Sequence, residues 1–296
     1  MILVTGANGF VGKHLVKHLL SLGYHVISLV RNHVNTEDKS KAIDTSDRHH
    51  IVVGDLANSP EIPFDVDIVF HLAGQIVLPQ TTDEDFSSKN KNATEGLIGS
   101  LGRLDVNRVI NLSTTSIYGA VVNGAAFEHM PPREPNAYAT SKYKSEQVLS
   151  QFDKGISLTH VRTPGIIGSG ANPNLISNLV ALASAGLPVE LSNLQTDFNN
   201  VVHVSDVCSF LSHLLDRKPI IGCDSVNLAS SKPITINNMA KLIIEHYGNR
   251  SSVMVKSSSV APYIIDIEKL RKIYNFEPLT VSQAIARFLD ELHDSK

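Results

Sequence analysis

The sequence predicts an α/β protein, in which a doubly wound parallel sheet is followed by a smaller, mixed C-terminal lobe. In roughly the first half of the chain, short and nearly continuous apolar runs alternate with helical patterns, which is typical of a parallel sheet covered on both faces. Gly6, Gly9 and Gly12 directly follow the first apolar run and open the first helical pattern. Beyond Pro164 this alternation gives way to shorter runs interrupted by glycine and proline.

Each element follows from a local pattern of apolar residues and its boundaries. The sheet is expected to contain strands at 1–4, 25–30, 51–53, 67–73, 108–112 and 156–161, with helices at 11–22, 83–104 and 138–152 and a polar loop at 31–50. The second lobe is expected to contain helices at 174–185, 205–215, 236–247 and 281–292, with short strands at 189–191, 201–204 and 226–228. We therefore expect a dinucleotide-binding domain over 1–163, rejoined by about 197–220, and a substrate-binding lobe over 164–196 and 221–296.

Composition and charge exclude several classes of function. The 296 residues are 42% hydrophobic and 19% charged with a formal net charge of −3, which gives no reason to expect nucleic acid or an anionic membrane as partner. Cys208 and Cys223 are the two cysteines, and neither they nor the scattered histidines show the spacing of metal ligands, so we expect no metal site. The absence of a signal peptide before the first strand and of an apolar run of membrane-spanning length favours a cytoplasmic location.

The spacing of the three N-terminal glycines, G-x-x-G-x-x-G, indicates a dinucleotide site. Gly6 permits a tight turn, Gly9 allows the backbone to approach a pyrophosphate, and Gly12 allows close packing of helix on strand. The N-terminus of the following helix offers free N–H groups to the phosphates. The sequence context, strand then glycines then helix, makes a Rossmann-type nucleotide site much more plausible than turn glycines alone.

A second constellation lies at Tyr138 and Lys142, which are four residues apart at the start of a predicted helix. This spacing places both side chains on one face, one turn apart. A nearby ammonium favours the phenolate, so the tyrosine becomes a usable acid and base. A tyrosine that packs on the core beside a solvated lysine is the alternative, because the pattern also recurs by chance.

The motifs together resemble the extended short-chain dehydrogenases/reductases, the group that includes NAD-dependent epimerases and dehydratases. The matching segments are TGANGFVG at 5–12, GDL at 54–56, HLAG at 71–74, LSTTSIYG at 112–119, YATSK at 138–142, RTPGIIGSG at 162–170 and VHVSDV at 202–207. The match extends to about residue 230.

The resemblance implies a set of site residues. Tyr138 is the expected catalytic acid and base, Lys142 holds the nicotinamide ribose and tunes the tyrosine, and Thr114 (with Ser113 as second choice) supplies the catalytic hydroxyl. The segment at 55–56 would flank the adenine, 72–74 would line the cofactor, and the backbone of 164–166 would meet the nicotinamide. The expected cofactor-binding residues are Gly6, Asn8, Gly9, Phe10, Val11, Gly12, Arg31, Asp55, Leu56, Leu72, Ala73, Gly74, Tyr138, Lys142, Pro164 and Ile166.

Two departures from the family pattern refine the expected reaction. NAD-specific members end the second strand with an acidic residue, whereas this chain has Val30 followed by Arg31, whose guanidinium can bind a 2′-phosphate; NADP(H) is therefore favoured over NAD(H). Dehydratases carry an Asp-Glu pair directly after the catalytic threonine, whereas this chain has Thr115-Ser116, so dehydration is not expected.

The leading hypothesis is an NADPH-dependent ketoreductase acting on a nucleotide-linked 4-keto-6-deoxy sugar. The alternatives are a sugar-nucleotide epimerase with bound NAD(P), a reductase of a small ketone or aldehyde resembling dihydroflavonol reductases, and a non-enzymatic NADP(H)-binding relative. The last is disfavoured because the Tyr/Lys pair is present.

The sequence contains fewer motifs for the substrate than for the cofactor. Family members that bind nucleotide sugars often contact them through an Asn and an Arg, and both are replaced in this chain; Gly165 stands at the position of the Asn. A homodimer through the helices around 83–104 and 138–152 is common in similar proteins. Asn92 either orders the helix after HLAG or lies on the surface. The candidate substrate contacts, which could equally be ordinary loop residues, are Gln75, Ser116, Asn172 and Asn200.

Overall fold

The computed structural model describes residues 1–296 except 33–46, 78–79, 122–123, 153–154, 259–262 and 295–296. The chain forms two compact units. The first comprises Met1–Ile117, Pro135–Val161 and Cys208–Ser225, and the second comprises Tyr118–Glu134, Arg162–Val207 and Val226–Lys296. The assignment of cofactor to one part of the chain and substrate to the other stays a prediction.

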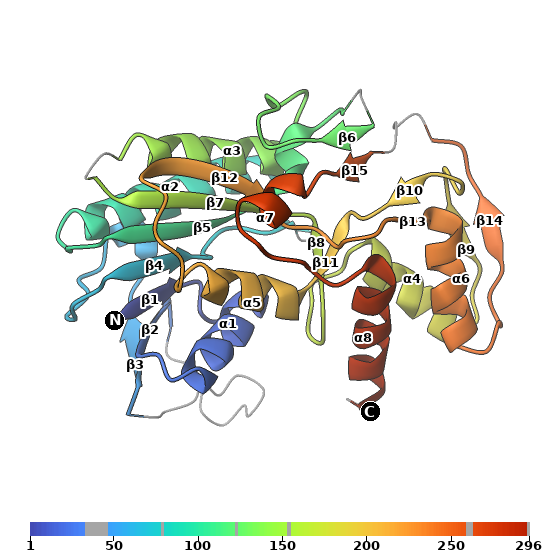
Figure 1. Ribbon diagram of the computed structural model, residues 1–296, viewed down its shortest axis with the longest axis horizontal. Helices are drawn as coiled ribbons and strands as arrows, with labels where there is room; N and C mark the ends of the chain where they lie inside the picture. The colour runs from blue at the N-terminus through green and yellow to red at the C-terminus, as the bar shows by residue number, and fades with distance from the viewer. Residues whose placement is uncertain (33–46, 78–79, 122–123, 153–154, 259–262, 295–296) are drawn as a thin grey trace. The chain divides into compact units, whose positions relative to one another are not determined.

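The first unit is built on a seven-stranded sheet in the order β12-β7-β5-β4-β1-β2-β3 (Figure 1). The pairs β1–β2, β1–β4, β2–β3 and β4–β5 are all parallel. Strand order reverses next to β1, which confirms the doubly wound parallel sheet expected from the alternating pattern. The strands are β1 (Ile2–Thr5), β2 (Val26–Val30), β3 (His49–Val53), β4 (Ile68–His71), β5 (Arg108–Thr114), β7 (Ser157–Thr163) and β12 (Gly222–Asn227).

Helices cover both faces of this sheet. Helices α2 (Asp83–Leu101) and α3 (Ala137–Ser150) lie together on one face, and α1 (Phe10–Ser21) and α5 (Val204–His213) lie on the other (Figure 1). The central strands β1 and β2 are buried along their whole length, because both of their faces are covered. Two short 3-10 helices, η1 (Leu56–Asn58) and η2 (Thr115–Tyr118), follow β3 and β5.

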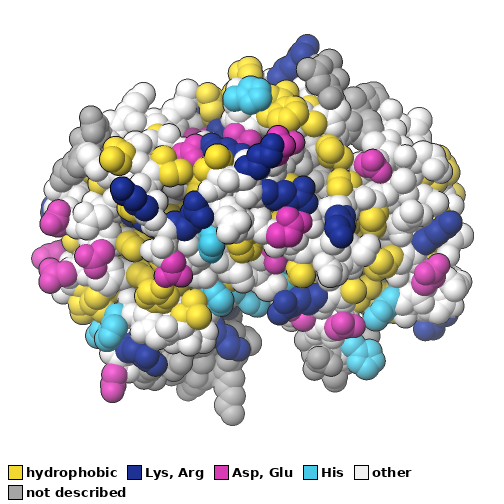
Figure 2. Space-filling model, in the orientation of Figure 1, with side chains coloured by type: hydrophobic (Ala, Val, Ile, Leu, Met, Phe, Trp, Pro, Cys, Tyr) yellow, Lys and Arg dark blue, Asp and Glu magenta, His cyan; other side chains and the backbone are white. Residues whose placement is uncertain are grey.

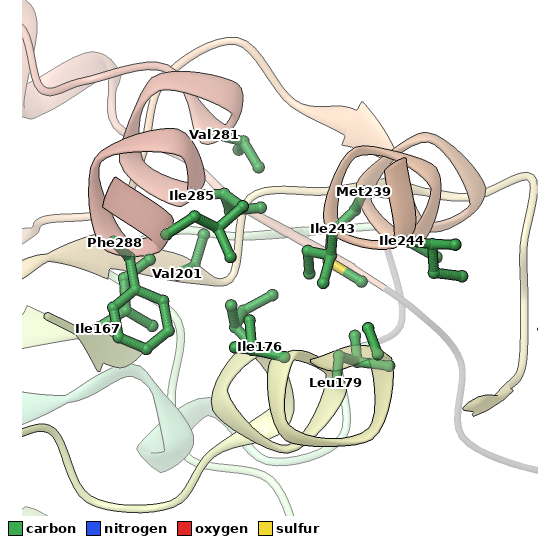
Figure 3. Packing of buried hydrophobic residues seen from close by; sticks show 14 of the residues in the cluster. Ile167, Ile176, Leu179, Val201, Met239, Ile243, Ile244, Val281, Ile285 and Phe288 are labelled. Atoms are coloured by element: carbon green, nitrogen blue, oxygen red, sulfur yellow. The ribbon is translucent and has the colours of Figure 1, made fainter. Parts of the chain in front are cut away.

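The second unit has a separate hydrophobic core. Helices α4 (Leu175–Ser184), α6 (Ile236–His246) and α8 (Val281–Asp294) contribute most of it, and Figure 3 shows Ile176, Ile243 and Ile285 from these helices directed toward one another. The remaining elements are β6 (Ala125–Ala126), β8 (Gly165–Ile167), β9 (Val189–Leu191), β10 (Asp197–Phe198), β11 (Val201–His203), β13 (Ile234–Thr235), β14 (Val253–Val255), β15 (Ile264–Ile265) and α7 (Glu268–Lys272).

The expected strand at 226–228 differs from the observed one. Strand β12 begins at Gly222, four residues earlier than expected, and extends the main sheet beside β7, although its last two residues belong to the second unit. The signal was weak because Cys223, Asp224 and Ser225 interrupt the apolar run. Part of the expected loop at 31–50 is also strand, since β3 starts at His49, while 33–46 lies outside the described residues.

On the face shown in Figure 2, side chains of both charges are interspersed. Among the described residues, no helix is both long and apolar enough to cross a membrane.

Candidate active site

The glycine turn after β1 requires glycine at two of its three positions. Gly6 has φ +68°, and a Cβ there would lie 2.7 Å from the backbone nitrogen of Ala73. A Cβ on Gly12 would lie 2.8 Å from Cα of Ala7 and would overlap the carbonyl oxygen of Gly6. The loop therefore packs against the first turn of α1 and against the end of β4 with no room for a side chain.

The N-terminus of α1 is suited to an anion. Gly9 is its N-cap residue, no side chain caps it, and its first turn contains no acidic residue. Backbone N–H groups at a helix N-terminus and the positive end of the helix dipole attract phosphate. Asn8 and Gly9 are exposed, and Phe10 and Val11 are partly buried. The residues present thus fit the diphosphate of a dinucleotide.

A buried hydrogen-bond pair ties the glycine turn to β4. Thr5 Oγ1 accepts from the backbone N–H of Ala73 at 3.3 Å and lies 2.9 Å from His71 Nδ1. Burial, with smaller contributions from nearby Lys142 and His160, lowers the pKa of His71 to about 3, so the imidazole is neutral. A neutral ring can accept the Thr5 hydroxyl proton at Nδ1, and the pair then fixes the relative position of the turn and of Leu72–Gly74.

The expected catalytic hydroxyls lie within hydrogen-bonding reach of each other. Thr114 ends β5, and Tyr138 lies in the first turn of α3, which Asn136 begins by accepting from the N–H of Ala139 at 2.8 Å. Burial raises the pKa of Tyr138, and its side-chain hydrogen bond with Thr114 acts in the opposite direction. The ring of Phe86 meets that of Tyr138 edge to face, 5.5 Å between centroids, which restricts the orientation of the phenol.

Lys142 lies one turn after Tyr138 and is buried. Its Nζ donates to the carbonyl oxygen of Leu112 at 2.8 Å. Burial lowers the pKa of Lys142 to about 8, although nearby Glu146 favours the charged form. The strand that presents Thr114 thus also anchors the ammonium through its backbone, two residues earlier.

Asn90 is a candidate site residue that none of the sequence motifs includes. It is 2% exposed in the middle of α2; its Oδ1 accepts from the N–H of Gln75 at 2.6 Å, and its Nδ2 donates to Ser141 Oγ at 2.8 Å. One side chain therefore connects the segment after β4 to the helix that carries Tyr138 and Lys142. Asn92, the residue considered for ordering this region, is exposed. The spacing Phe86, Asn90, Thr94, Leu97 on one helical face could have pointed to Asn90.

Comparison with known proteins agrees with this geometry. The model of a family described as the NAD dependent epimerase/dehydratase family matches residues 2–229. The chain belongs to that family. It is an enzyme of the NAD(P)-dependent, extended short-chain dehydrogenase/reductase type, as expected from its motifs.

Relatives in the family act on nucleotide-linked sugars. The chain is 26% identical to GDP-6-deoxy-D-talose 4-dehydrogenase of Aggregatibacter actinomycetemcomitans over 82% of its length and 79% of that enzyme. It is 21% identical to dTDP-4-dehydro-6-deoxy-D-allose reductase of Streptomyces bikiniensis, covering 94% and 91%. The structure of MoeE5 in complex with UDP-glucuronic acid and NAD is similar with a TM-score of 0.81 and 25% identity, covering 100% and 99%.

In the first unit, the other residues that the family pattern predicts to bind the cofactor lie just after the ends of strands. Arg31 is exposed after β2. Asp55 is exposed after β3, where its side chain accepts from the N–H of Ala57 at 3.0 Å, and Leu56 is buried in the core. Gly74 is exposed after β4, and a Cβ there would lie 3.8 Å from Lys142 Nζ. All of these positions are at the carboxyl edge of the parallel sheet, where ligands bind in doubly wound folds.

Two of the candidate substrate contacts also lie in the first unit. Ser116 is exposed, its Oγ accepts from Thr114 Oγ1, and its N–H donates to the same atom, both at 3.1 Å. Gln75 is partly buried and donates from its side chain to the carbonyl oxygen of Ile76 at 3.1 Å.

The remaining expected residues lie in the second unit. Pro164 and Ile166 are partly buried, and the carbonyl oxygen of Ile166 accepts from Asn174 Nδ2 at 3.2 Å. Asn172 is exposed. Asn200 is partly buried, and its Oδ1 is buried without a hydrogen-bond partner among the described residues.

Proposed function

We propose that this protein reduces the 4-keto group of a nucleotide-linked 6-deoxy sugar with NADPH. The juxtaposition of the Thr114 and Tyr138 side chains, with buried Lys142 one helical turn away, is the observation that carries the proposal. Two hydroxyls that converge in this way can both bind one carbonyl oxygen. The relatives that act on the 4-position of 6-deoxy sugars support the choice of substrate.

Most of the residues that would hold the cofactor lie in the first unit, whereas Pro164 and Ile166 lie in the second. The diphosphate would rest on the backbone of Gly6–Gly12 and the N-terminus of α1, the adenine would lie beside Asp55 and Leu56, and Lys142 would bind the nicotinamide ribose. Leu72–Gly74 would line the site, and the Pro164–Ile166 backbone would meet the nicotinamide. When bound, NADPH supplies the hydride.

The chain's own residues would orient the ketone and move the proton. Thr114 donates a hydrogen bond to the carbonyl oxygen and thereby polarises the bond. Tyr138 gives its proton to the same oxygen as negative charge develops there, and the Lys142 ammonium stabilises the phenolate that remains. Burial raises the pKa of the partly buried Tyr138, which opposes proton release, so the proposed mechanism requires the ammonium to stabilise the phenolate. Gln75, Ser116, Asn172 and Asn200 are the proposed substrate contacts.

The proposed preference for NADPH depends on Arg31. No carboxylate ends β2, and the exposed guanidinium that follows can form paired hydrogen bonds with a 2′-phosphate. The MoeE5 structure contains NAD, so the proposed preference is argued from Arg31 of this chain alone. Arg31→Ala should lower the ratio of kcat/KM for NADPH over NADH about tenfold or more. An unchanged ratio would leave no role for Arg31.

Net reduction is favoured over dehydration by one feature of the chain. Thr115 and Ser116 stand where dehydratases of the family need carboxylates. An epimerase should copurify with its cofactor and interconvert sugars without net NADPH consumption, and a dihydroflavonol-reductase-like enzyme should prefer simple carbonyls. These alternatives can be tested by measuring NADPH consumption, from its absorbance, with a panel of dTDP-, GDP- and CDP-linked 4-keto sugars and of simple ketones. If none of the nucleotide sugars caused NADPH consumption, the proposed substrate would be rejected.

Tyr138→Phe tests the proton donor. We expect kcat to fall by about two to four orders of magnitude while NADPH affinity is retained, because the ring is kept and only the hydroxyl is lost. Tyr143→Phe, on the same helix, is the matched control and should leave kcat unchanged. A Tyr138→Phe enzyme with full kcat would contradict the proposed mechanism.

A further inference from the structure

The turn that follows β3 packs unusually closely on α2. A Cβ on Gly96 would lie 2.7 Å from the carbonyl carbon of Leu56 and would overlap its oxygen. A Cβ on Gly99, almost one turn later, would lie 2.9 Å from Cβ of Ser59. Because the helix meets the backbone of Leu56 and the side chain of Ser59 here, η1 has no room to move toward the helix.

Hydrogen bonds from residues at the C-terminus of α2 hold the last residues of the same turn, Ser59 and Pro60. Ser100 Oγ, which is 2% exposed, donates to the carbonyl oxygen of Pro60 at 3.0 Å. Arg103 lies two residues beyond the end of α2, and its Nη2 donates to the carbonyl oxygens of Ser59 and, at 3.2 Å, Pro60. A charged donor shared by two carbonyls resists rotation of the turn away from the helix.

The turn itself has few other anchors. Asp55, Ala57 and Asn58 are exposed, and Leu56 is the member of this segment whose side chain enters the core. The same helix carries Asn90 toward the segment after β4. Helix α2 thus supports both the turn after β3 and the segment beside the proposed catalytic residues.

We propose that Arg103 is a positioning residue for the cofactor. With Gly96 and Ser100, it fixes the turn that contains Asp55 and Leu56, and it thereby sets the affinity for the adenine half of NADPH without contacting the cofactor. This inference rests on the cofactor-binding part of the proposed function, and it requires nothing of the sugar substrate.

The test compares binding of the two halves of the cofactor. Isothermal titration calorimetry with 2′,5′-ADP and ligand-observed NMR with reduced nicotinamide mononucleotide would be applied to Arg103→Ala, Arg103→Lys and wild type. Arg103→Ala should weaken 2′,5′-ADP binding about three- to tenfold, the size expected for a lost hydrogen bond to a charged donor at the surface, and change mononucleotide binding less than about twofold. Arg103→Lys should recover much of the loss, because an ammonium can donate to the same carbonyls.

Lys91→Ala is the matched control, because Lys91 is an exposed cation on α2 paired with Glu95 on the same helix. It should leave both affinities unchanged. If Arg103→Ala weakened the binding of 2′,5′-ADP and of the mononucleotide equally, Arg103 would have only a general structural role and the proposal would be overturned. The proposal would also be overturned if neither affinity changed, or if wild type did not bind 2′,5′-ADP. Failure of ketone reduction with the fragment pattern intact would reject the proposed reaction alone.

Discussion

Replacement of Lys142 by methionine should separate the stability of the fold from its chemistry. Lys142 is 8% exposed, and burial lowers its pKa from 10.5 to about 8. At about 1.36 kcal/mol per pKa unit, keeping this group charged costs the folded state about 3 kcal/mol at neutral pH. Because the folded-state pKa is lowered, this cost is complete below pH 8 and fades as the pH rises from 8 toward 10.5.

One further term accompanies the substitution. The carbonyl of Leu112 loses its donor, which is worth about 1 kcal/mol. Because a neutral amine donates to the same carbonyl, this loss is about the same at pH 7 and at pH 10, and the attraction of Glu146 is already contained in the pKa of Lys142. The stability difference between Lys142→Met and wild type should therefore move by about 2 to 3 kcal/mol between these pH values, with the variant relatively more stable at pH 7.

The assay is urea denaturation of both proteins at pH 7 and pH 10, followed by circular dichroism. Lys144→Met is the matched control, because Lys144 is exposed on the same helix, and its stability difference should not depend on pH in this range. The activity of Lys142→Met should be lost at every pH. A pH-independent difference between Lys142→Met and wild type would refute the conclusion that burial of the charged ammonium destabilises the fold.

Two other substitutions test the glycine turn and the second unit. Gly12→Ala should destabilise the protein by about 1 to 3 kcal/mol and weaken NADPH binding, because the added Cβ would overlap the Gly6 carbonyl oxygen. Gly102→Ala is the control, because the nearest neighbour of its added Cβ lies at 3.4 Å, and this variant should fold and bind NADPH as wild type does. Calorimetry of unfolding and of NADPH binding tests both variants. Asp206 accepts from the N–H of Leu279, and burial raises its pKa to about 6, so the stability contributed by its protonated form is lost as the pH rises through 6. Asp206→Asn keeps the hydrogen-bond acceptor, and in urea denaturation it should be more stable than wild type by about 3 kcal/mol at pH 8 but nearly equal to wild type at pH 4. An equal difference in stability at both pH values would contradict the raised pKa of Asp206.

Local patterns in the sequence were sufficient for the sheet, the glycine turn and the Tyr138–Lys142 pair. An apolar run, a glycine spacing and a one-turn helical spacing each involve residues close in sequence, so their geometry follows from backbone periodicity. The predicted helix bounds differ from the observed ones by a few residues, and the parallel order follows from the alternation of strands and helices. The predicted roles of individual site residues await the experiments above.

The partners of the site residues depended on tertiary structure. Asn90 meets Gln75 and Ser141, which lie 15 and 51 residues away, and no local pattern encodes that meeting. The contact of Gly96 with the turn after β3, and the anchoring of Lys142 on the carbonyl of Leu112, likewise arise only when helices pack on the sheet. The sequence by itself determines which segments are buried, because burial follows apolar periodicity. Which polar groups meet there is decided by packing, because most buried donors and acceptors find their partners only in the folded chain.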